Sequence, residues 1–255
     1  MIIEISVTVL VILFFVAILA GTVDSIAGGG GLLTLPALLA AGLPAPIALG
    51  TNKLQSTFGT SVATYNYYKH GLFSFKTVLA GLFFGIAGAV LGAILTQSIH
   101  SDILKKIIPV LLFAILLYTI FSPKLGELDR TPKISEKVFF PLFGFILGFY
   151  DGFLGPGTGS FWAASLVYFL GYNLSKATAY TKILNLKSNL VSLICFLFMG
   201  SIYFKVGFVM AAGQIIGGNI GSKFVLKKGA KLIRPIFIVV VALTIITLIY
   251  KNYVV

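Results

Sequence analysis

Asp24 and Asp151 are the residues with the clearest potential for chemistry, because both lie inside long apolar stretches. The chain has seven acidic residues, and the other five fall in the N-terminal segment or in polar connections. A carboxylate at membrane depth costs at least about 2.5 kcal/mol, so it usually has a partner or a role. Each aspartate could cap the helix that follows it, gate a pathway or carry a coupled proton.

A glycine-rich break follows each of these aspartates at the same spacing. The candidate binding residues in the two breaks are Gly28, Gly29, Gly30, Gly155, Gly157 and Thr158. In a bilayer such broken backbone is tolerated only when it is buried in protein or lines a cavity. Its amides, with the positive end of the next helix dipole, predict an anion site. The alternative interpretation is a tight helical hairpin that needs small residues.

Polar residues also interrupt the apolar stretch that follows each break. The candidate substrate-binding side chains are Asn52, Lys53, Gln55, Thr181, Lys182, Asn185 and Asn189. Spacings of three and four residues place several of them on one helical face in each half. Lys53 and Lys182 could each pair with one of the two aspartates, or present positive charge to an anionic ligand. The amides and hydroxyls could instead hydrogen-bond neighbouring helices.

The composition places these residues in a membrane protein. The chain is 58% hydrophobic and 10% charged, with a mean hydropathy of +1.04, whereas soluble domains are about 45–50% apolar and about 25% charged. Runs long enough for transmembrane helices cover 5–23, 46–69, 75–97, 103–122, 136–152, 174–199, 203–225 and 231–250. Two shorter runs, 30–42 and 157–171, each follow a glycine break. We predict an all-α polytopic membrane protein with about eight long transmembrane helices and two short broken or re-entrant half-helices.

The two halves of the chain repeat each other. Asp24 and the first break correspond to Asp151 and the second break, and Pro109 corresponds to Pro235, all at offsets of 126 to 130 positions. We therefore predict a first transmembrane repeat at 1–122, a cytoplasmic connection at 123–135 and a second transmembrane repeat at 136–255. Duplicated hydropathy of this kind is typical of secondary transporters.

The basic residues predict how the repeats are oriented. The net charge of +12 lies mostly in short connections, which is the positive-inside pattern of membrane insertion rather than a sign of nucleic-acid binding. If the connections 69–76, 123–137, 171–176 and 223–234 are cytoplasmic, they hold twelve Lys and Arg, against four on the other side. The loop at Gly71 then lies inside and its counterpart at Gly200 lies outside. The repeats are therefore predicted to be inverted, with both termini outside.

Several other functions are not expected from this sequence. It contains no HExxH motif and no paired catalytic Ser–His or Cys–His residues in the apolar segments, so we do not expect an enzyme. Nothing near His70 or His100 resembles a metal cluster, and no cofactor is expected. The second break loosely resembles a phosphate-binding loop but lacks its Lys-Ser/Thr ending. The regularly spaced glycines Gly81, Gly85, Gly88, Gly92, Gly213, Gly217 and Gly221 are predicted to pack helices. Gln214 and Asn219 could reach the cavity.

The chain resembles the TauE/SafE family of membrane transporters, which are also described as sulfite or organosulfonate exporters. The resemblance rests on Asp24-Ser-Ile-Ala-Gly-Gly-Gly-Gly, Pro36, Gly42, Thr51-Asn52-Lys53, the stretch from Gly152 to Ser160, and Thr181-Lys182 through Asn189. It covers essentially the whole chain. It implies export of small sulfur-containing anions, such as sulfite or sulfonates, across the bacterial inner membrane.

These observations lead us to expect a secondary transporter whose small anionic substrate binds between the two halves. An inside-negative potential contributes about 2.3 kcal/mol per unit charge per 100 mV toward expelling an anion. If protons are coupled, Asp24 and Asp151 are the natural carriers. The alternative is an anion channel, or a transporter of another small organic anion, on the same scaffold. The expected partners are the substrate and the lipid bilayer, with an oligomer left open.

Overall fold

The computed structural model describes residues 5–104, 106–108, 110, 113–114 and 129–228, and every regular element in that part of the chain is a helix. The helices are α1 (Val7–Ala27), α2 (Gly31–Ala40), α3 (Ala45–Lys69), α4 (Phe75–Ser98), α6 (Glu136–Phe153), α7 (Thr158–Leu170), α8 (Leu174–Phe198) and α9 (Phe204–Lys228). They occupy the apolar ranges expected from the sequence. Most of the expected segment 103–122 and all of 231–250 lie outside the described residues.

Three of the described helices, α1, α4 and α8, are long and apolar enough to cross a membrane by length and composition. α3 and α9 are also 25 residues long but carry more polar residues than α1 and α4. The polar residues of α3 are mostly buried, as in a helix that faces protein on most sides. The described part of the chain is therefore all-helical, as in a helical membrane protein, while the full count of eight crossings stays a prediction.

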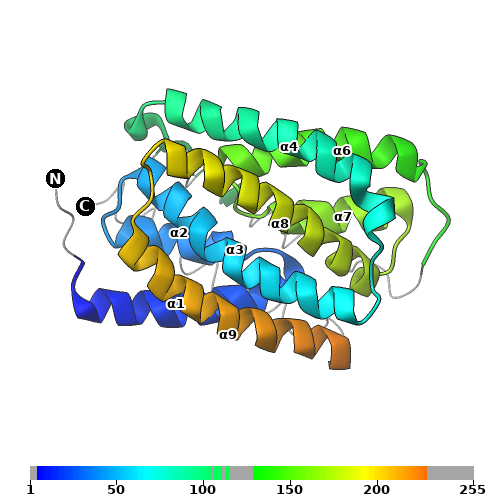
Figure 1. The fold of residues 1–255 in the computed structure, drawn as a ribbon, viewed down its shortest axis with the longest axis horizontal. Coiled ribbons are helices and arrows are strands. Elements are labelled where there is room, and N and C mark those ends of the chain that lie inside the picture. The colour runs from blue at the N-terminus through cyan, green and yellow to red at the C-terminus, as the bar shows by residue number, and fades with distance from the viewer. Residues whose placement is uncertain (1–4, 105, 109, 111–112, 115–128, 229–255) are drawn as a thin grey trace.

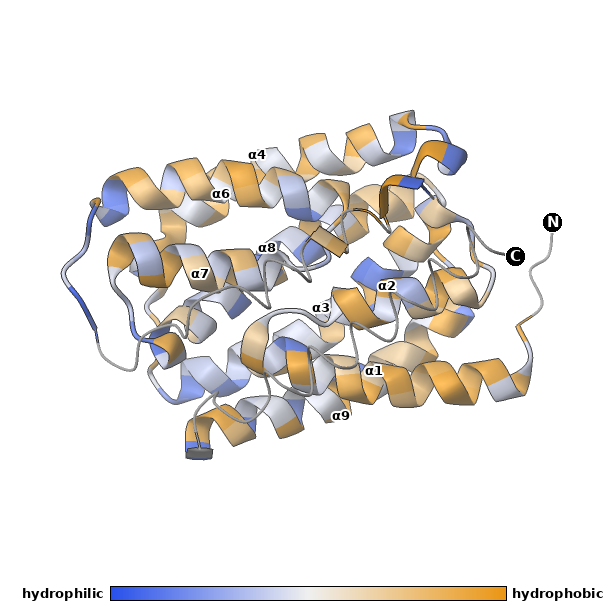
Figure 2. Cartoon of the chain, turned by 180° about the vertical axis from the view of Figure 1, so that it is seen from behind, coloured by the Kyte–Doolittle hydropathy of each residue, from blue (hydrophilic) through white to orange (hydrophobic). Residues whose placement is uncertain are grey.

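Helices from the first half of the chain pack against helices from the second half. α1 packs along α9, α4 packs along α6, and α3 contacts both α8 and α9. Figure 2 shows that α1, α4 and α6 are largely hydrophobic, whereas α3 and α8 are paler. The more polar helices are therefore held between apolar ones.

Glycines allow the α4–α6 and α1–α9 contacts. A Cβ added to Gly88 or Gly92 of α4 would overlap a backbone carbonyl oxygen of α6, and one added to Gly217 of α9 would overlap Ile18 O of α1. Small residues let helix backbones approach closely when both helices lie in an apolar environment. The prediction that these spaced glycines pack helices is confirmed.

Four basic segments lie at the same end of the bundle. Figure 1 shows that the α3–α4 turn, the segment 129–135, the α7–α8 connection and the end of α9 share one end, opposite the start of α1 and the α8–α9 connection. These are the described parts of the four connections that the charge pattern predicts to be cytoplasmic. Their common position agrees with a single charged face, and which side of the membrane they face stays a prediction.

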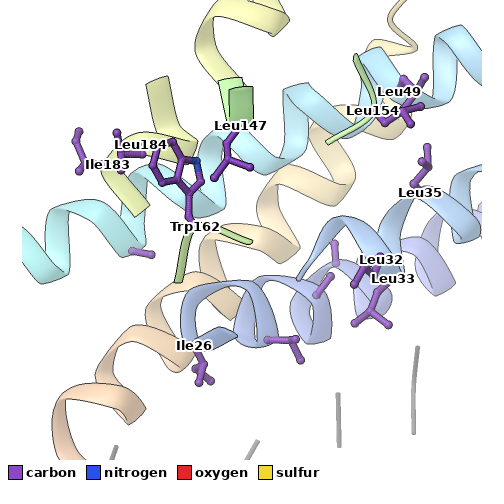
Figure 3. Packing of buried hydrophobic residues seen from close by; sticks show 14 of the residues in the cluster. Ile26, Leu32, Leu33, Leu35, Leu49, Leu147, Leu154, Trp162, Ile183 and Leu184 are labelled. Carbon is purple, nitrogen blue, oxygen red and sulfur yellow. The ribbon is translucent and has the colours of Figure 1, made fainter. Parts of the chain in front are cut away.

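The short helices α2 and α7 are anchored by buried apolar side chains. Trp162 of α7 is fully buried and makes an edge contact with Phe139 of α6, at a centroid distance of 6.2 Å. Figure 3 shows Trp162 among Leu147, Ile183 and Leu184, with Leu32, Leu33 and Leu35 of α2 farther along the same core. Both helices are therefore fixed in the protein interior, and so are the glycine breaks that precede them.

Candidate functional site

The two glycine breaks meet each other inside the bundle. Gly28 adopts a left-handed conformation with φ of 74°, which ends α1. Ser160 at the start of α7 donates its N–H to Gly28 O at 3.1 Å and its hydroxyl to Ala27 O at 3.0 Å. A Cβ on Gly28 would lie 2.5 Å from the backbone of Gly159. Only glycine fits this close approach, so both breaks are needed to bring the two helix starts together.

Two buried ion pairs cross between the halves of the chain. Lys53 Nζ of α3 lies 2.7 Å from Asp151 Oδ1 of α6, and Lys182 Nζ of α8 lies 3.0 Å from Asp24 Oδ2 of α1. The sequence permits either lysine to pair with either aspartate. In the structure each lysine pairs with the aspartate of the other half.

The crossed pairs are nearly sealed from solvent. Lys53 is 1% exposed, Lys182 is 0% exposed and Asp151 is 3% exposed, whereas the Asp24 side chain keeps 19% of its accessible surface. Removing one partner from a buried pair leaves an uncompensated charge and costs about 3–5 kcal/mol. Each pair therefore stabilises the contact between the halves only while both of its residues are present.

Each aspartate has a second hydrogen-bonding task. Asp24 Oδ1 accepts the N–H of Gly30 at 3.2 Å, so it caps the start of α2, and its backbone carbonyl also accepts Lys182. Asp151 Oδ1 instead accepts the hydroxyl of Thr158 at 3.3 Å. Asp24 therefore caps the next helix as expected, by accepting a backbone N–H. Asp151 accepts a side-chain hydroxyl from the next helix instead.

A small cavity that is partly open to solvent lies between the breaks and the two polar helices, and its empty space reaches about 320 Å³ only when the open part is included. Its lining is made entirely of polar side chains and glycines: Asp24, Gly28, Gly31, Asn52, Lys53, Ser56, Thr60, Asp151, Gly155, Gly157, Gly159, Asn185 and Asn189. This lining offers no apolar side chains to an apolar ligand, whereas a small polar or charged ligand could hydrogen-bond to it.

The structure gathers many of the predicted site residues around this cavity. The predicted residues that line it are Gly28, Asn52, Lys53, Gly155, Gly157, Asn185, Asn189, Asp24 and Asp151. Six others do not line it, namely Gly29, Gly30, Gln55, Thr158, Thr181 and Lys182. Several of the six are engaged elsewhere: Lys182 with Asp24, Thr158 with Asp151, and Gln55 with Asn52 Oδ1 at 2.8 Å.

Four lining residues were not among the predicted binding residues. They are Gly31, Ser56, Thr60 and Gly159. Asn52, Ser56 and Thr60 are spaced by four, so they share one face of α3, and this spacing is the signal that identifies Thr60. Thr60 Oγ1 also accepts the amide of Asn189 from α8 at 3.4 Å.

Gln214 and Asn219, which were expected to be able to reach the cavity, do not line it. Gln214 lies against Gly21 and Gly59, where a Cβ on either glycine would come close to its side-chain oxygen. Asn219 accepts the amide of Asn66 at 3.3 Å. Both side chains contribute to contacts between α9 and its neighbours.

The residues that line the cavity include potential hydrogen-bond donors. The N–H groups of Gly31, Gly157 and Gly159 have no hydrogen-bond acceptor among the described residues. Gly155 has φ of 89°, and a Cβ there would lie 2.7 Å from Lys53 Nζ, so the glycine leaves room for the ammonium group. Free amides at the start of a helix, beside a lysine, favour a small anion. No group of His, Cys, Asp and Glu among the described residues could hold a metal ion.

The chain is similar to known membrane transporter proteins. The sulfite exporter TauE/SafE family matches residues 13–248. A probable membrane transporter protein of Haemophilus influenzae is 47% identical over 236 residues, covering 92% of both chains. The probable membrane transporter protein YfcA of Escherichia coli K12 is 45% identical over 242 residues, covering 95% of this chain and 90% of that protein. A more distant relative, the probable membrane transporter protein YunE of Bacillus subtilis, is 23% identical over 95% of this chain and 98% of its own.

No solved structure matches this chain. The family match spans nearly all of the sequence, and relatives named as membrane transporters align with it from end to end. The chain therefore belongs to the TauE/SafE sulfite exporter family.

Proposed function

We propose that this protein is a secondary transporter that exports small sulfur-containing oxyanions, such as sulfite or organosulfonates, across the bacterial inner membrane. The observation that carries the proposal is the cavity in which Lys53 and glycines with unbonded amides are both part of the lining. Buried cations are costly in a membrane and usually mark a substrate or ion pathway. The family description, sulfite exporter, supports the choice of substrate class.

The donors around the cavity suit an oxyanion. The amides of Gly31, Gly157 and Gly159 would bind its oxygens, and the Lys53 ammonium would balance its charge. The carboxylates of Asp24 and Asp151 would repel an anion if they were unpaired. Their ion pairs with Lys182 and Lys53 reduce that repulsion.

Transport in this proposal depends on the repeats 1–122 and 136–255. The halves rock about the central cavity and expose it to each side in turn, as in other inverted-repeat transporters. The crossed pairs Lys53–Asp151 and Lys182–Asp24 join the two halves. Movement of one half against the other would therefore strain or exchange these pairs, which makes them natural gates.

Export also agrees with the energetics. An inside-negative membrane potential drives a monovalent anion outward by about 2.3 kcal/mol per 100 mV, whatever the orientation of the protein. A coupled ion is then not required for export. If protons are coupled, Asp24 is the more accessible of the two carboxylates, since its side chain is 19% exposed against 4% for Asp151.

Flux through proteoliposomes tests the proposal. The purified protein is reconstituted and supplied with sulfite, methanesulfonate, taurine, sulfate and acetate at imposed voltage and pH gradients, with protein-free liposomes as the control. We expect saturable, voltage-driven movement of a sulfur oxyanion, with counterflow. Flux without saturation or counterflow would indicate a channel instead. If no sulfur anion moves or binds, the proposed substrate class is wrong.

A further inference from the structure

Lys187 of α8 is a buried cation that the proposed binding site does not use. The residue is 8% exposed, does not line the cavity, and its ammonium nitrogen has no hydrogen-bond partner among the described residues. A buried charge without a partner costs several kcal/mol, so its presence calls for an explanation.

The surroundings of Lys187 are shaped to hold its ammonium group. A Cβ added to Gly85 of α4 would overlap Lys187 Nζ, and the same point lies 3.0 Å from Gly144 O of α6. The missing side chain at Gly85 therefore makes the space that the ammonium group occupies, between α4 and α6. This space is part of the α4–α6 contact, the most extensive helix contact between the first and second halves of the chain.

Asp151 supplies the second unsatisfied group in this region. Its Oδ1 is bonded to Lys53 and Thr158, while its Oδ2 is buried and has no partner among the described residues. Asp151 follows Gly144 and Gly148 on the same face of α6. It lies seven residues past Gly144, whose carbonyl oxygen borders the space of the ammonium group, or about 10.5 Å along the helix axis. The charges of Asp151 and Lys53 both act on Lys187.

The other half of the chain shows no such arrangement. Asp24 uses both of its carboxylate oxygens, one for Gly30 and one for Lys182. The side chain that enters the matching glycine-lined space, against Gly21 and Gly59, is the neutral amide of Gln214. The described core therefore holds three buried lysines against the buried Asp151 and the partly exposed Asp24. The sum of their formal charges is one positive charge, and the unpaired cation lies on the side of Asp151.

We propose that Lys187 is the alternate partner of Asp151, and that it takes up this carboxylate when an anion in the cavity draws Lys53 away. The inference rests on the proposed anion transport. In the empty state Lys53 is paired with Asp151. The carboxylate occupies the ammonium group, so Lys53 cannot give its full charge to an anion. In the loaded state Lys53 binds the anion, Lys187 binds Asp151, and the three lysines are balanced by two carboxylates and one anion. Lys187 is thus a positioning residue, which acts on the substrate through Asp151.

A substitution at Lys187 separates this role from a structural one. In Lys187→Met the apolar stem is kept and the unpaired charge is removed, so the melting temperature without anion should stay the same or rise. The stabilisation of the protein by added sulfite or methanesulfonate should shrink, because ligand stabilisation reports affinity. Exchange of the same anions in proteoliposomes should fall by at least about tenfold. Lys187→Arg keeps the charge and should restore part of the exchange.

Gln214→Met is the matched control, since it also replaces a buried polar side chain at a glycine-lined helix contact. It should leave the response to anions close to that of the wild type.

A double-mutant cycle with Asp151→Asn tests whether Lys187 acts through Asp151. Once Asp151 is neutral, Lys187→Met should change the stabilisation by anions no further. The melting-temperature cycle decides this even where Asp151→Asn abolishes exchange.

The outcomes are distinguishable. If the wild type neither responds to nor moves any anion, the proposed function is wrong. If the wild type responds and Lys187→Met responds equally well, or if the Lys187 and Asp151 effects simply add, Lys187 is not the alternate partner. A lower melting temperature of anion-free Lys187→Met, with its anion response unchanged, would show that Lys187 only fills space.

Discussion

Lys53 and Asp151 lie 98 residues apart in the chain, yet their charged atoms are 2.7 Å apart in the centre of the bundle. Lys53 also donates to Asn189 Oδ1 at 3.3 Å, so one ammonium group joins α3, α6 and α8. It lines the cavity at the same time. Any change in its charge therefore affects the packing of three helices and the binding of a ligand.

Lys53→Met should destabilise the protein, because Asp151 loses the cation that holds it and is left with Lys187 as its alternate partner. We expect a loss of up to about 3–5 kcal/mol, the upper value applying if Lys187 does not take up the carboxylate, measured by thermal or denaturant unfolding in detergent. The double variant Lys53→Met/Asp151→Asn should recover much of this stability while remaining inactive in flux assays. A double variant as unstable as the single one would show that the pair does not act as a unit.

Lys182→Met should cost less than Lys53→Met, even though it breaks an equivalent pair. The Asp24 side chain keeps 19% of its surface accessible, against 4% for Asp151, so water can partly solvate the abandoned carboxylate. The same unfolding measurement, carried out on both variants side by side, checks this order. A larger loss at Lys182 would contradict the burial argument.

Gly92→Ala should weaken the α4–α6 contact, because the added methyl group would overlap Phe149 O. Helix separation of this kind typically costs about 1–3 kcal/mol. The control is Gly42→Asn: a Cβ at Gly42 meets no atom within 4 Å, and Asn tolerates the left-handed backbone better than most residues. Melting temperatures in detergent should fall further for Gly92→Ala than for Gly42→Asn, whose cost is limited to the left-handed backbone at Gly42.

Asp24→Asn and Asp151→Asn test whether either carboxylate carries a coupled proton. If one does, its neutral variant should lose the dependence of flux on pH while retaining transport driven by voltage. Flux is measured in proteoliposomes between pH 5 and pH 8, with the wild type in parallel. Unchanged pH profiles in both variants would remove both residues from any coupling role.

The basic connections lie at one end of the bundle. They should therefore all be reached by a labelling reagent from the same side of the membrane. In a Cys195→Ser background, Lys133→Cys should resist a membrane-impermeant maleimide in intact cells and react after permeabilisation, because segment 129–135 is predicted to be cytoplasmic. Met199→Cys should react in intact cells, because Met199 directly follows α8 in the α8–α9 connection, which lies at the opposite end of the bundle (Figure 1). The reverse pattern would overturn the predicted orientation but leave the fold unaffected.

Hydropathy predicted the positions of the described helices well, since apolar runs and glycine breaks are local signals. α3, for example, was expected at 46–69 and runs from Ala45 to Lys69. The choice of partner for each lysine is a different matter, because the two halves carry the same Asp and Lys spacing and the sequence does not distinguish the pairings. Which polar residues face the cavity was also only partly predictable: Gln55 and Thr181 are buried in helix contacts, while Thr60 lines the space.

The crossed pairing of Lys53 with Asp151 has a consequence for how the chain is made. During synthesis Lys53 emerges 98 residues before its partner, which at about 5–20 residues per second is an interval of about 5–20 s. The newly inserted first half must therefore hold its lysine and Asp24 in the membrane without the partners they have in the finished bundle. Its biogenesis cannot be completed until the second half arrives, so the first half expressed alone should be degraded, and co-expression of the second half should rescue it.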